Sequence, residues 1–172
     1  MKPKTVMRDN GQEPGQAHSM GLGVTPGSII LTLAGETLIE DVKPGDRVIT
    51  RDSGTAVVTG VSKQRLTCHA VRILAGSLGD TRPDRDVVLP ADQPVLVRDW
   101  RAKALFGKRQ AVARAASLVD GEFITREGIR TLTLFEIQFD APHVIYADGL
   151  ELAVQADSAD IAQPKPARHD AA

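Results

Sequence analysis

Short apolar runs separated by turn residues dominate the chain between residues 23 and 154. The stretch GVTPGSIILT (23–32) opens this pattern, because a polar segment without periodicity precedes it and the β-branched run Ile29-Ile30-Leu31 lies within it. Runs of this kind, bounded by Gly, Pro and Asp, are typical of β-strands. The predicted strands are SIILTL, TLIEDV, RVITRD, TAVVTGVSKQRL, AVRILA, DVVLP and PVLVRDW. Many short strands at regular spacing predict an all-β sandwich or barrel-like fold.

The pattern changes between residues 101 and 119. RAKALFG predicts one helical turn, and AVARAASLV predicts a short helix that Asp-Gly ends. Further along, EFITREG and RTLTLFEIQFD predict one hairpin, and HVIYADGLELAV predicts another. We therefore expect a mostly β, antiparallel fold with one or two short helices.

Both ends of the chain are predicted to be disordered tails. Residues 1–22 are rich in Gly, Gln, Pro and charge, and residues 155–172 are mostly small and polar. Such composition does not bury enough apolar surface to fold by itself. The folded domain is expected to span residues 23–154.

Composition limits the classes of partner. Hydrophobic residues make up 42% of the chain and aromatic residues only 3%, so the core should consist mainly of Val, Ile, Leu and Ala. The net charge of −1 gives no electrostatic support for a nucleic-acid partner. No apolar run approaches the roughly 20 residues that span a bilayer, and no apolar segment typical of a secretory signal follows the basic N-terminus. We expect a cytoplasmic protein with no membrane partner.

A single cysteine, Cys68, excludes an internal disulfide and a cysteine-rich zinc site. Four acidic residues could be imagined as metal ligands, but they are spread over strand ends, where acidic turn residues are the ordinary case. They are Asp86, Asp92, Asp99 and Asp140. We expect neither a metal nor another cofactor.

Two segments of the chain resemble each other. VKPGDRVITRDSG (42–54) and LVDGEFITREG (118–128) both place an apolar residue before a Gly turn and a strand that ends in Ile-Thr-Arg. The repetition predicts a pseudo-twofold arrangement of two similar halves. Arg51 and Arg126 at the ends of the two motifs are expected to be solvated.

Four segments, taken in order, resemble the Hint (Hedgehog/intein) domain family, in particular its bacterial stand-alone members. They are GVTPGSIILTLAGETLIEDVKPGDRVITRDSG, VVLPADQPVLVRDW, QAVARAASLVDGEFI and FDAPHVIYADGLELAV. The resemblance covers residues 23–154 and implies the Hint-type pseudo-twofold antiparallel β-fold.

The resemblance also implies a reaction. In the family, a Cys or Ser at the first position attacks the preceding carbonyl, while a Thr and a His polarise that peptide and protonate its departing nitrogen. Inteins finish through a His-Asn ending.

This chain departs from the family pattern at each of these positions. Gly23 occupies the nucleophile position, Pro90 the Thr position and Gln93 the His position, and none of the three can replace the chemistry. The terminal His-Asn position falls near Ala153-Val154. The His of the family's closing segment corresponds to His143 in this chain, or to Pro142 if the alignment with the family shifts by one residue.

These departures predict a degenerate Hint domain without catalytic residues. Such a chain would not be an enzyme and would serve as an interaction or accessory module for an unidentified protein partner. Two alternatives stay open. One is an active self-processing domain with a non-standard nucleophile, and the other is an unrelated β-barrel that binds a small ligand.

Other residues with reactive or binding side chains have ordinary structural interpretations. Ser28 and Thr25 lie nearest the missing nucleophile, but no general base is evident beside them. Cys68 and His69 are neighbours on a predicted strand, so their side chains should point to opposite faces. Trp100, followed by Arg101 and Lys103, is expected to pack over a core edge.

Overall fold

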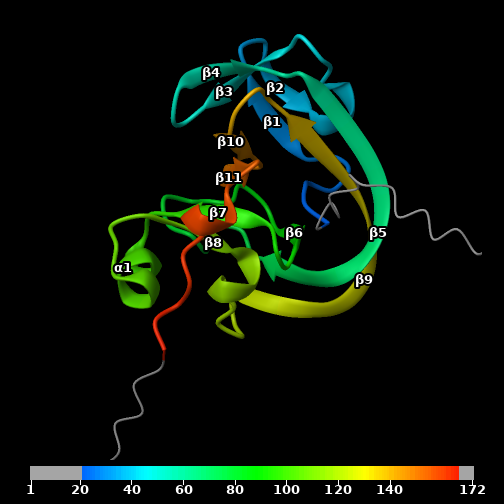
Figure 1. Cartoon of the computed structure of the whole chain (residues 1–172). Coiled ribbons are helices and arrows are strands. Elements are labelled where there is room, and N and C mark those ends of the chain that lie inside the picture. Colours follow the sequence, from blue (N-terminus) through cyan, green and yellow to red (C-terminus); the bar gives the residue numbers. More distant parts are fainter. Residues whose placement is uncertain (1–20, 167–172) are drawn as a thin grey trace, which may run out of the picture.

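The computed structural model of the chain describes residues 21–166 and consists mainly of antiparallel strands (Figure 1). The strands are β1 (Ile29–Thr32), β2 (Gly35–Leu38), β3 (Arg47–Thr50), β4 (Gly54–Val57), β5 (Gly60–Ile73), β6 (Val87–Pro90), β7 (Pro94–Val97), β8 (Ala111–Arg114), β9 (Ile124–Gln138), β10 (His143–Ala147) and β11 (Leu150–Val154). The helical elements are α1 (Trp100–Phe106) and the 3₁₀ turns η1 (Ile39–Asp41), η2 (Ala115–Leu118) and η3 (Ser158–Asp160). This architecture confirms the predicted mostly β fold.

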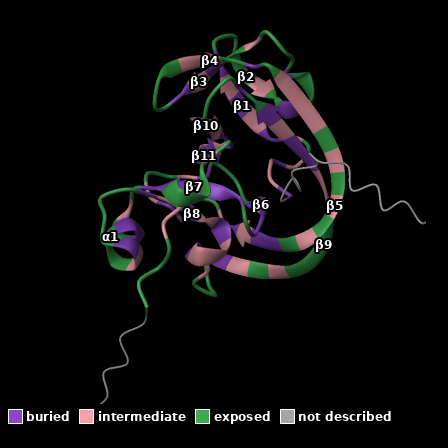
Figure 2. Ribbon diagram, viewed as in Figure 1, coloured by how far each residue is buried: buried purple, intermediate pink, exposed green. Residues whose placement is uncertain are grey.

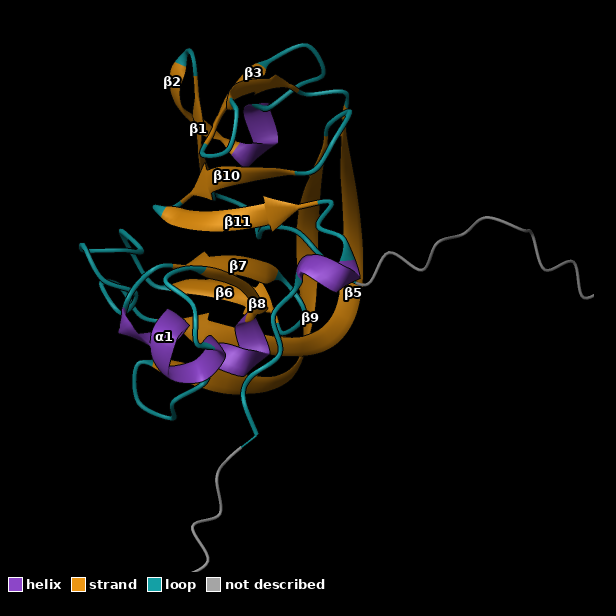
Figure 3. Ribbon diagram, turned by 60° about the vertical axis from the view of Figure 1, so that its left-hand side comes forward, coloured by secondary structure: helices purple, strands orange, loops and turns teal. Residues whose placement is uncertain are grey.

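The described strands form two sheets. The larger sheet follows the order β2-β1-β3-β10-β11-β7-β8, with β4 on β3, and the smaller sheet has the order β6-β5-β9. The long strands β5 and β9 form a ribbon that curves along one side of the molecule (Figures 1 and 3). The smaller sheet thereby connects the region of β1 to β4 with the region of β6 to β8.

The ribbon differs from the prediction of separate short strands. The prediction divided β5 into two strands and β9 into a hairpin, and both divisions are wrong, because each strand is continuous over 14 and 15 residues respectively. Glu127-Gly128 had the character of a turn, but it forms a bulge in β9 where the pairing register with β5 shifts. Gly128 has a positive φ of 73° there, a backbone conformation that favours glycine.

Burial alternates along the middle of the ribbon, as Figure 2 shows. Lys63, Arg65, Thr67 and His69 of β5 are exposed, while the residues between them are half-buried. One face of this two-stranded segment therefore lies toward solvent and the other toward the body of the domain.

The core has the composition that the sequence predicted. Its buried residues are mainly Val, Ile, Leu and Ala, and Phe106, Phe135 and Phe139 are its aromatic members. Val48 and Leu152 of the larger sheet and Ile73, Leu89 and Leu134 of the smaller sheet are among its fully buried side chains. A single apolar cluster therefore joins the elements of the described chain.

The helical prediction is correct in one segment and partly wrong in another. RAKALFG lies in α1, which Asp99 caps by accepting a hydrogen bond from Arg101 N, and which ends at Gly107 with a φ of 71°. The segment AVARAASLV was predicted as a short helix. It forms strand β8 followed by η2, because residues 111–114 pair with β7.

The described chain continues beyond the expected domain end at residue 154. Ala162 N donates a hydrogen bond of 2.7 Å to Val112 O, and Lys165 N donates one of 2.8 Å to Leu105 O. Residues 161–165 therefore pack against β8 and α1. Of the predicted tails, 1–22 and 155–172, the parts at residues 1–20 and 167–172 lie outside the described residues.

The order of elements repeats within the domain. The hairpin β1–β2 is followed by η1 and β3, and the hairpin β7–β8 is followed by η2 and β9. The two similar sequence segments, 42–54 and 118–128, occupy corresponding places in these halves. No helix among the described residues is long and apolar enough to cross a membrane.

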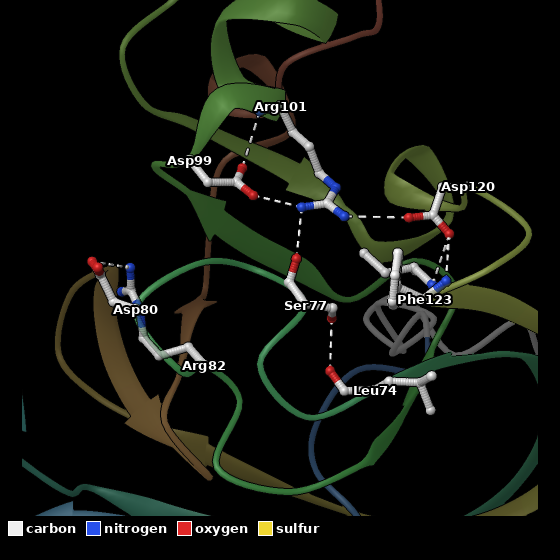
Figure 4. Close-up of polar contacts among 9 residues, drawn as sticks. Leu74, Ser77, Asp80, Arg82, Asp99, Arg101, Asp120 and Phe123 are labelled. Carbon is white, nitrogen blue, oxygen red and sulfur yellow. Dashed lines mark hydrogen bonds and ion pairs between the residues drawn. The ribbon is translucent and has the colours of Figure 1, made fainter.

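A buried arginine ties the loop between β5 and β6 to the rest of the domain (Figure 4). Arg101 is 5% exposed and donates hydrogen bonds to the Asp99 carboxylate, to Ser77 O at 2.7 Å and to Asp120 Oδ2 at 3.2 Å. A buried guanidinium is stable only when such partners satisfy it. Its other contact, with the Trp100 ring at 4.8 Å, leaves that ring 68% exposed instead of packed over the core.

Asp120 organises the turn before β9. Its Oδ1 accepts hydrogen bonds from the backbone N–H groups of Glu122, Phe123 and Ile124. Burial opposes the charged carboxylate, but these hydrogen bonds and the one from Arg101 outweigh burial and lower the pKa of Asp120 to about 2.

The low pKa of Asp120 predicts a defined pH dependence of stability. A carboxyl group with a lowered folded-state pKa stabilises the fold fully above its unfolded pKa near 3.8, and this contribution is lost as the pH falls toward 2. We expect Asp120→Asn to lower the melting temperature at pH 6 and to lose most of that effect at pH 2. Thermal unfolding of wild type and variant between pH 2 and 6 measures this difference in melting temperature. Asp41→Asn, at an exposed position of η1, is the control. A difference from wild type that is constant over this range would contradict the prediction.

Candidate functional site

In the structure Gln93 contacts both of the other positions that the resemblance assigns to catalytic residues of the family, Gly23 and Pro90. Gly23 lies at the start of the domain, and its backbone N–H donates a hydrogen bond of 2.8 Å to Gln93 Oε1. Gln93 lies in the turn between β6 and β7, where its own N–H donates to Pro90 O at 3.0 Å. The side chain of Gln93 is thereby directed toward the start of the domain.

The same amide also reaches the last long strand. Gln93 Nε2 donates to Pro94 O at 3.1 Å and to Ala153 O of β11 at 3.3 Å. Gln93 is 3% exposed, so its amide has little access to bulk water. We call this set of hydrogen bonds, from Gly23 through Gln93 to Ala153, the Gln93 clasp.

A small apolar cavity of about 30 Å³ adjoins the Gln93 clasp. A single water needs roughly 10–15 Å³ of such space, so the cavity can hold a water molecule or two. Its lining residues are Leu22, Gly23, Val24, Gln93, Phe135, Glu136, Ile137, Ile145, Leu152, Ala153, Val154 and Gln155. This lining contains no hydroxyl, thiol or imidazole group.

Glu136 is the single ionisable side chain in the cavity lining. It lies on β9 opposite Ser62 of β5, and burial raises the pKa of its carboxyl group above the ordinary value. The sequence offered no signal for this residue, because an isolated Glu in an alternating strand is ordinarily a solvent-facing side chain.

The backbone at Gly23 leaves no room for a side chain. Gly23 has a φ of 125°, and a Cβ atom there would lie 2.4 Å from Phe135 O. The close approach arises because Val24 and Phe135 exchange backbone hydrogen bonds of 2.9 and 2.8 Å immediately beside it. Glycine is therefore required by this backbone both for its conformation and for the space.

Pro90, the third departed position, does not border this cavity. It ends β6 opposite Ala70 and lines a separate hollow together with Cys68, His69 and Asp92. Burial, and then the nearby Asp92 carboxylate, raise the pKa of the Cys68 thiol, which disfavours the reactive thiolate.

His143 lies at a different place on the fold. Its Nδ1 is 2.8 Å from Asp52 Oδ2 and 3.2 Å from Ser53 Oγ, in the turn between β3 and β4. Burial of Asp52 favours its neutral form, but hydrogen bonds from Val144 N and His143 outweigh this effect and lower the Asp52 pKa. Ser53 and Asp52 contact the same ring nitrogen, so the three side chains do not form a nucleophile–base–acid relay.

The remaining candidates have structural partners. Ser28 is buried and its hydroxyl donates to Thr25 O at 2.8 Å, which closes the turn before β1. Asp86 accepts a hydrogen bond from Ala75 N, Asp99 caps α1, and no group of three or more His, Cys, Asp or Glu residues suited to a metal occurs in the part of the chain that the structure describes.

The two arginines of the sequence repeat have different surroundings. Arg126 and Arg51 are both exposed, as expected, but the guanidinium of Arg51 also pairs with the buried Glu151 carboxylate at 3.1 Å, a contact that the sequence did not predict.

The family of the chain follows from its sequence over nearly the whole described domain. A family model described as "Hint domain" matches residues 22–154. The chain belongs to the Hint domain family. This match overturns the alternative of an unrelated small-ligand-binding β-barrel. A search of curated proteins found no match.

Solved intein structures share the fold of this Hint domain. A DnaB intein from Synechocystis sp. PCC 6803 is 13% identical with a TM-score of 0.53, over 77% of this chain and 98% of that chain. The TvoVMA intein is 12% identical with a TM-score of 0.56, over 80% and 100%. A bacterial intein-like domain from Clostridium thermocellum is 17% identical with a TM-score of 0.46, over 78% and 99%.

We expect the Gln93 clasp to contribute strongly to the stability of this Hint domain. Gln93→Ala would leave Gly23 N and Ala153 O without their partner in a largely buried site, at a cost of about 1–3 kcal/mol for each group. Equilibrium unfolding in urea should therefore show a loss of about 2–6 kcal/mol. Gln138→Ala, an exposed amide on β9, is the matched control and should change stability by less than about 0.5 kcal/mol. Equal effects of the two variants would contradict a special role of Gln93.

The space around Gly23 gives a second prediction. Gly23→Ala must adopt an unfavourable φ and also displace Phe135, so we expect a loss of about 3 kcal/mol in the free energy of unfolding. Gly27→Ala is the matched control, because Gly27 has a φ of 81° but nothing lies within 4 Å of an added Cβ. That variant should lose only about 1 kcal/mol. Urea unfolding compares the two, and equal losses would exclude the contact with Phe135 as a cause.

Proposed function

We propose that this Hint domain does not cleave or ligate its own chain, and that it acts as a non-enzymatic interaction or accessory module for a protein partner. The observation that carries the proposal is the Gln93 clasp. Glycine stands at the position where the family's reaction requires a nucleophile, and the amide of Gln93 stands where it requires a proton-transferring imidazole. A hydrogen bond joins the two residues.

The nucleophile position supports the proposal on steric grounds. A side chain at residue 23 would meet Phe135 O, so the backbone itself is arranged for glycine. The nearest hydroxyl groups belong to Thr25 and Ser28. The Ser28 hydroxyl already donates a hydrogen bond to the Thr25 backbone carbonyl within the turn before β1. Neither residue lines the cavity beside Gln93.

The proton-transfer position supports it on chemical grounds. A glutamine amide donates and accepts hydrogen bonds but does not exchange a proton near neutral pH. Gln93 can therefore hold the Gly23 N–H and the Ala153 carbonyl in place, but it cannot protonate a departing amide nitrogen.

One observation favours the competing function of self-processing. Glu136 borders the same cavity with a raised pKa, and a carboxyl group of this kind is suited to general acid–base work. It would need water or a hydroxyl from outside the cavity lining as nucleophile. Glu136→Gln therefore separates the two functions.

Exposed apolar side chains support a role in binding. Leu33 follows β1 and is 59% exposed, and Val57 of β4 is 44% exposed. Both residues neighbour Arg47 of β3, through the Leu33 N to Arg47 O hydrogen bond and the Arg47–Val57 pairing. Apolar side chains beside a cation are a common composition of protein-binding surfaces.

We expect the intact mass of the purified chain to stay at 18.4 kDa after prolonged incubation with dithiothreitol or hydroxylamine. These nucleophiles would capture a thioester or ester and release a fragment that begins at Gly23, Thr25 or Ser28. Hydroxylamine also cleaves Asn-Gly bonds, so a fragment beginning at Gly11 is not counted. Electrospray mass spectrometry identifies each product.

A time-dependent fragment beginning at Gly23, Thr25 or Ser28 would overturn the proposal. Its loss in Glu136→Gln, with a folded chain confirmed by circular dichroism, would assign the general acid or base to Glu136. An unchanged wild-type mass together with an unchanged variant mass is the expected result.

A further inference from the structure

Three arginine side chains converge on one buried carboxylate, away from the Gln93 clasp. The Glu151 carboxylate on β11 is 2% exposed. Its Oε1 accepts from Arg51 Nη1 at 3.1 Å, and its Oε2 lies 2.8 Å from Arg98 Nε and 3.0 Å from Arg82 Nη1. We call Arg51, Arg82 and Arg98 the arginine cluster.

The three guanidinium groups come from separate parts of the fold. Arg51 follows β3, Arg98 follows β7, and Arg82 lies in the loop between β5 and β6 that Arg101 holds through Ser77. Figure 4 shows Arg82 on this loop, with Asp80 beside it. The position of the arginine cluster is therefore fixed by rigid elements and by a buried hydrogen-bond network.

The cluster carries more positive charge than its carboxylate neutralises. Three arginines against one glutamate leave two positive charges in excess, and arginine stays protonated at every working pH. The next carboxylate, Asp80, is 3.6 Å from Arg82 and 89% exposed, so solvent screens much of its attraction.

The cluster also has more hydrogen-bond donors than its acceptors use. Each guanidinium has five N–H donors, whereas Glu151 accepts three hydrogen bonds or ion-pair contacts from the cluster. Arg82 Nε is buried and has no hydrogen-bond partner among the described residues. A charged donor without a partner is costly in a buried place.

The geometry leaves the cluster open to a ligand. The side chains of Arg51 and Arg98 are 32% and 31% exposed, while Arg82 is 18% exposed. A cavity of about 10 Å³, room for a single water molecule, lies beside Arg82 and Arg98 and is lined also by Glu151 and apolar side chains, so a ligand would bind at the outer edges of the guanidinium groups. The buried carboxylate positions the guanidinium groups, and their outer edges remain accessible.

We propose that the arginine cluster binds a phosphate group, either as inorganic phosphate or on a small organic molecule. A phosphate dianion matches the two excess charges, and guanidinium groups bind phosphate oxygens with paired N–H donors. The site is independent of the Gln93 clasp and of the absence of self-processing.

Phosphate titration of the ¹⁵N-labelled chain tests the proposal. Two-dimensional NMR spectra that include the arginine Nε–H signals are recorded with inorganic phosphate and with O-phosphoserine, and the ionic strength is kept constant with chloride. We expect saturable shifts at Arg51, Arg82 and Arg98 with phosphate but not with chloride. Stronger binding of O-phosphoserine would assign the site to an organic phosphate, and stronger binding of inorganic phosphate would assign it to the free ion.

Arg51→Met is the informative variant, because Arg82 and Arg98 still pair with Glu151 in it, and circular dichroism checks that it folds. We expect at least tenfold weaker phosphate binding. Arg65→Met, which removes an exposed positive charge from the ribbon, is the matched control and should bind as wild type. Arg51→Lys keeps the charge but not the paired donors, and severalfold weaker binding is expected even if Arg51→Met folds poorly.

Three results would overturn the proposal. Equal NMR shifts with phosphate and with chloride would mean that the ions act only by general screening. Equal losses of phosphate affinity in Arg51→Met and Arg65→Met would mean that binding depends only on the net charge of the chain. Unchanged binding in both Arg51 variants would place the phosphate elsewhere on the molecule.

Discussion

The amide side chain of Gln93 fixes the place where the start of the domain meets its last long strand. A buried amide is stable only if its donors and its acceptor are paired, and Gly23 N, Pro94 O and Ala153 O provide these partners. The Gln93 carbonyl in turn accepts from Ala115 N at 2.9 Å, which ties η2 to the same turn. A shift of any of these segments would break a hydrogen bond that water cannot easily replace.

This constraint explains how a Hint fold can persist with glutamine at the position that the resemblance assigns to the family's His. The fold needs hydrogen bonds between the start of the domain and β11, and the Gln93 amide supplies them. The family's reaction needs a group that transfers a proton, which an amide does not do. The glycine at residue 23 belongs to the same arrangement. Because Val24 pairs with Phe135 so closely, the space that a nucleophilic side chain would require is occupied by backbone. A side chain at residue 23 would therefore require the segment to separate from β9.

The sequence predicted the fold class and most element types, because short apolar runs and turn residues are local signals. It failed where a local signal has two meanings. Glu127-Gly128 is a turn in isolation but a bulge when a long partner strand continues alongside it. The segment 111–114 has helical composition but pairs with β7. Tertiary contacts decide whether such a segment forms a turn, a helix or a strand, and the periodicity of the sequence carries no information about these contacts.

In the candidate site, only the residues that align with the family's catalytic positions could be predicted from the sequence. The resemblance identified Gly23 and Gln93, and the structure places them in contact at 2.8 Å. Glu136 and the Phe135 carbonyl, which shape the cavity, lie more than 40 residues further along the chain than Gln93, and nothing in their local sequence marks them. The ion pair of Arg51 was not predicted for the same reason, since its partner Glu151 is 100 residues away.

Strand β11 connects these observations physically. It lies between β10, which pairs with the strands of the first half, and β7, which begins the second half. Residues 150–153 are all buried, so neither face of the strand is stabilised by water. Ala153 is held by the Gln93 amide, and Glu151 is held by arginines from both halves. A buried carboxylate with guanidinium partners is a weak source of net stability but is strongly destabilising when one partner is missing. The pairing of Glu151 therefore acts mainly by excluding other registers of β11, because any shift by one residue would leave this charge in the apolar core.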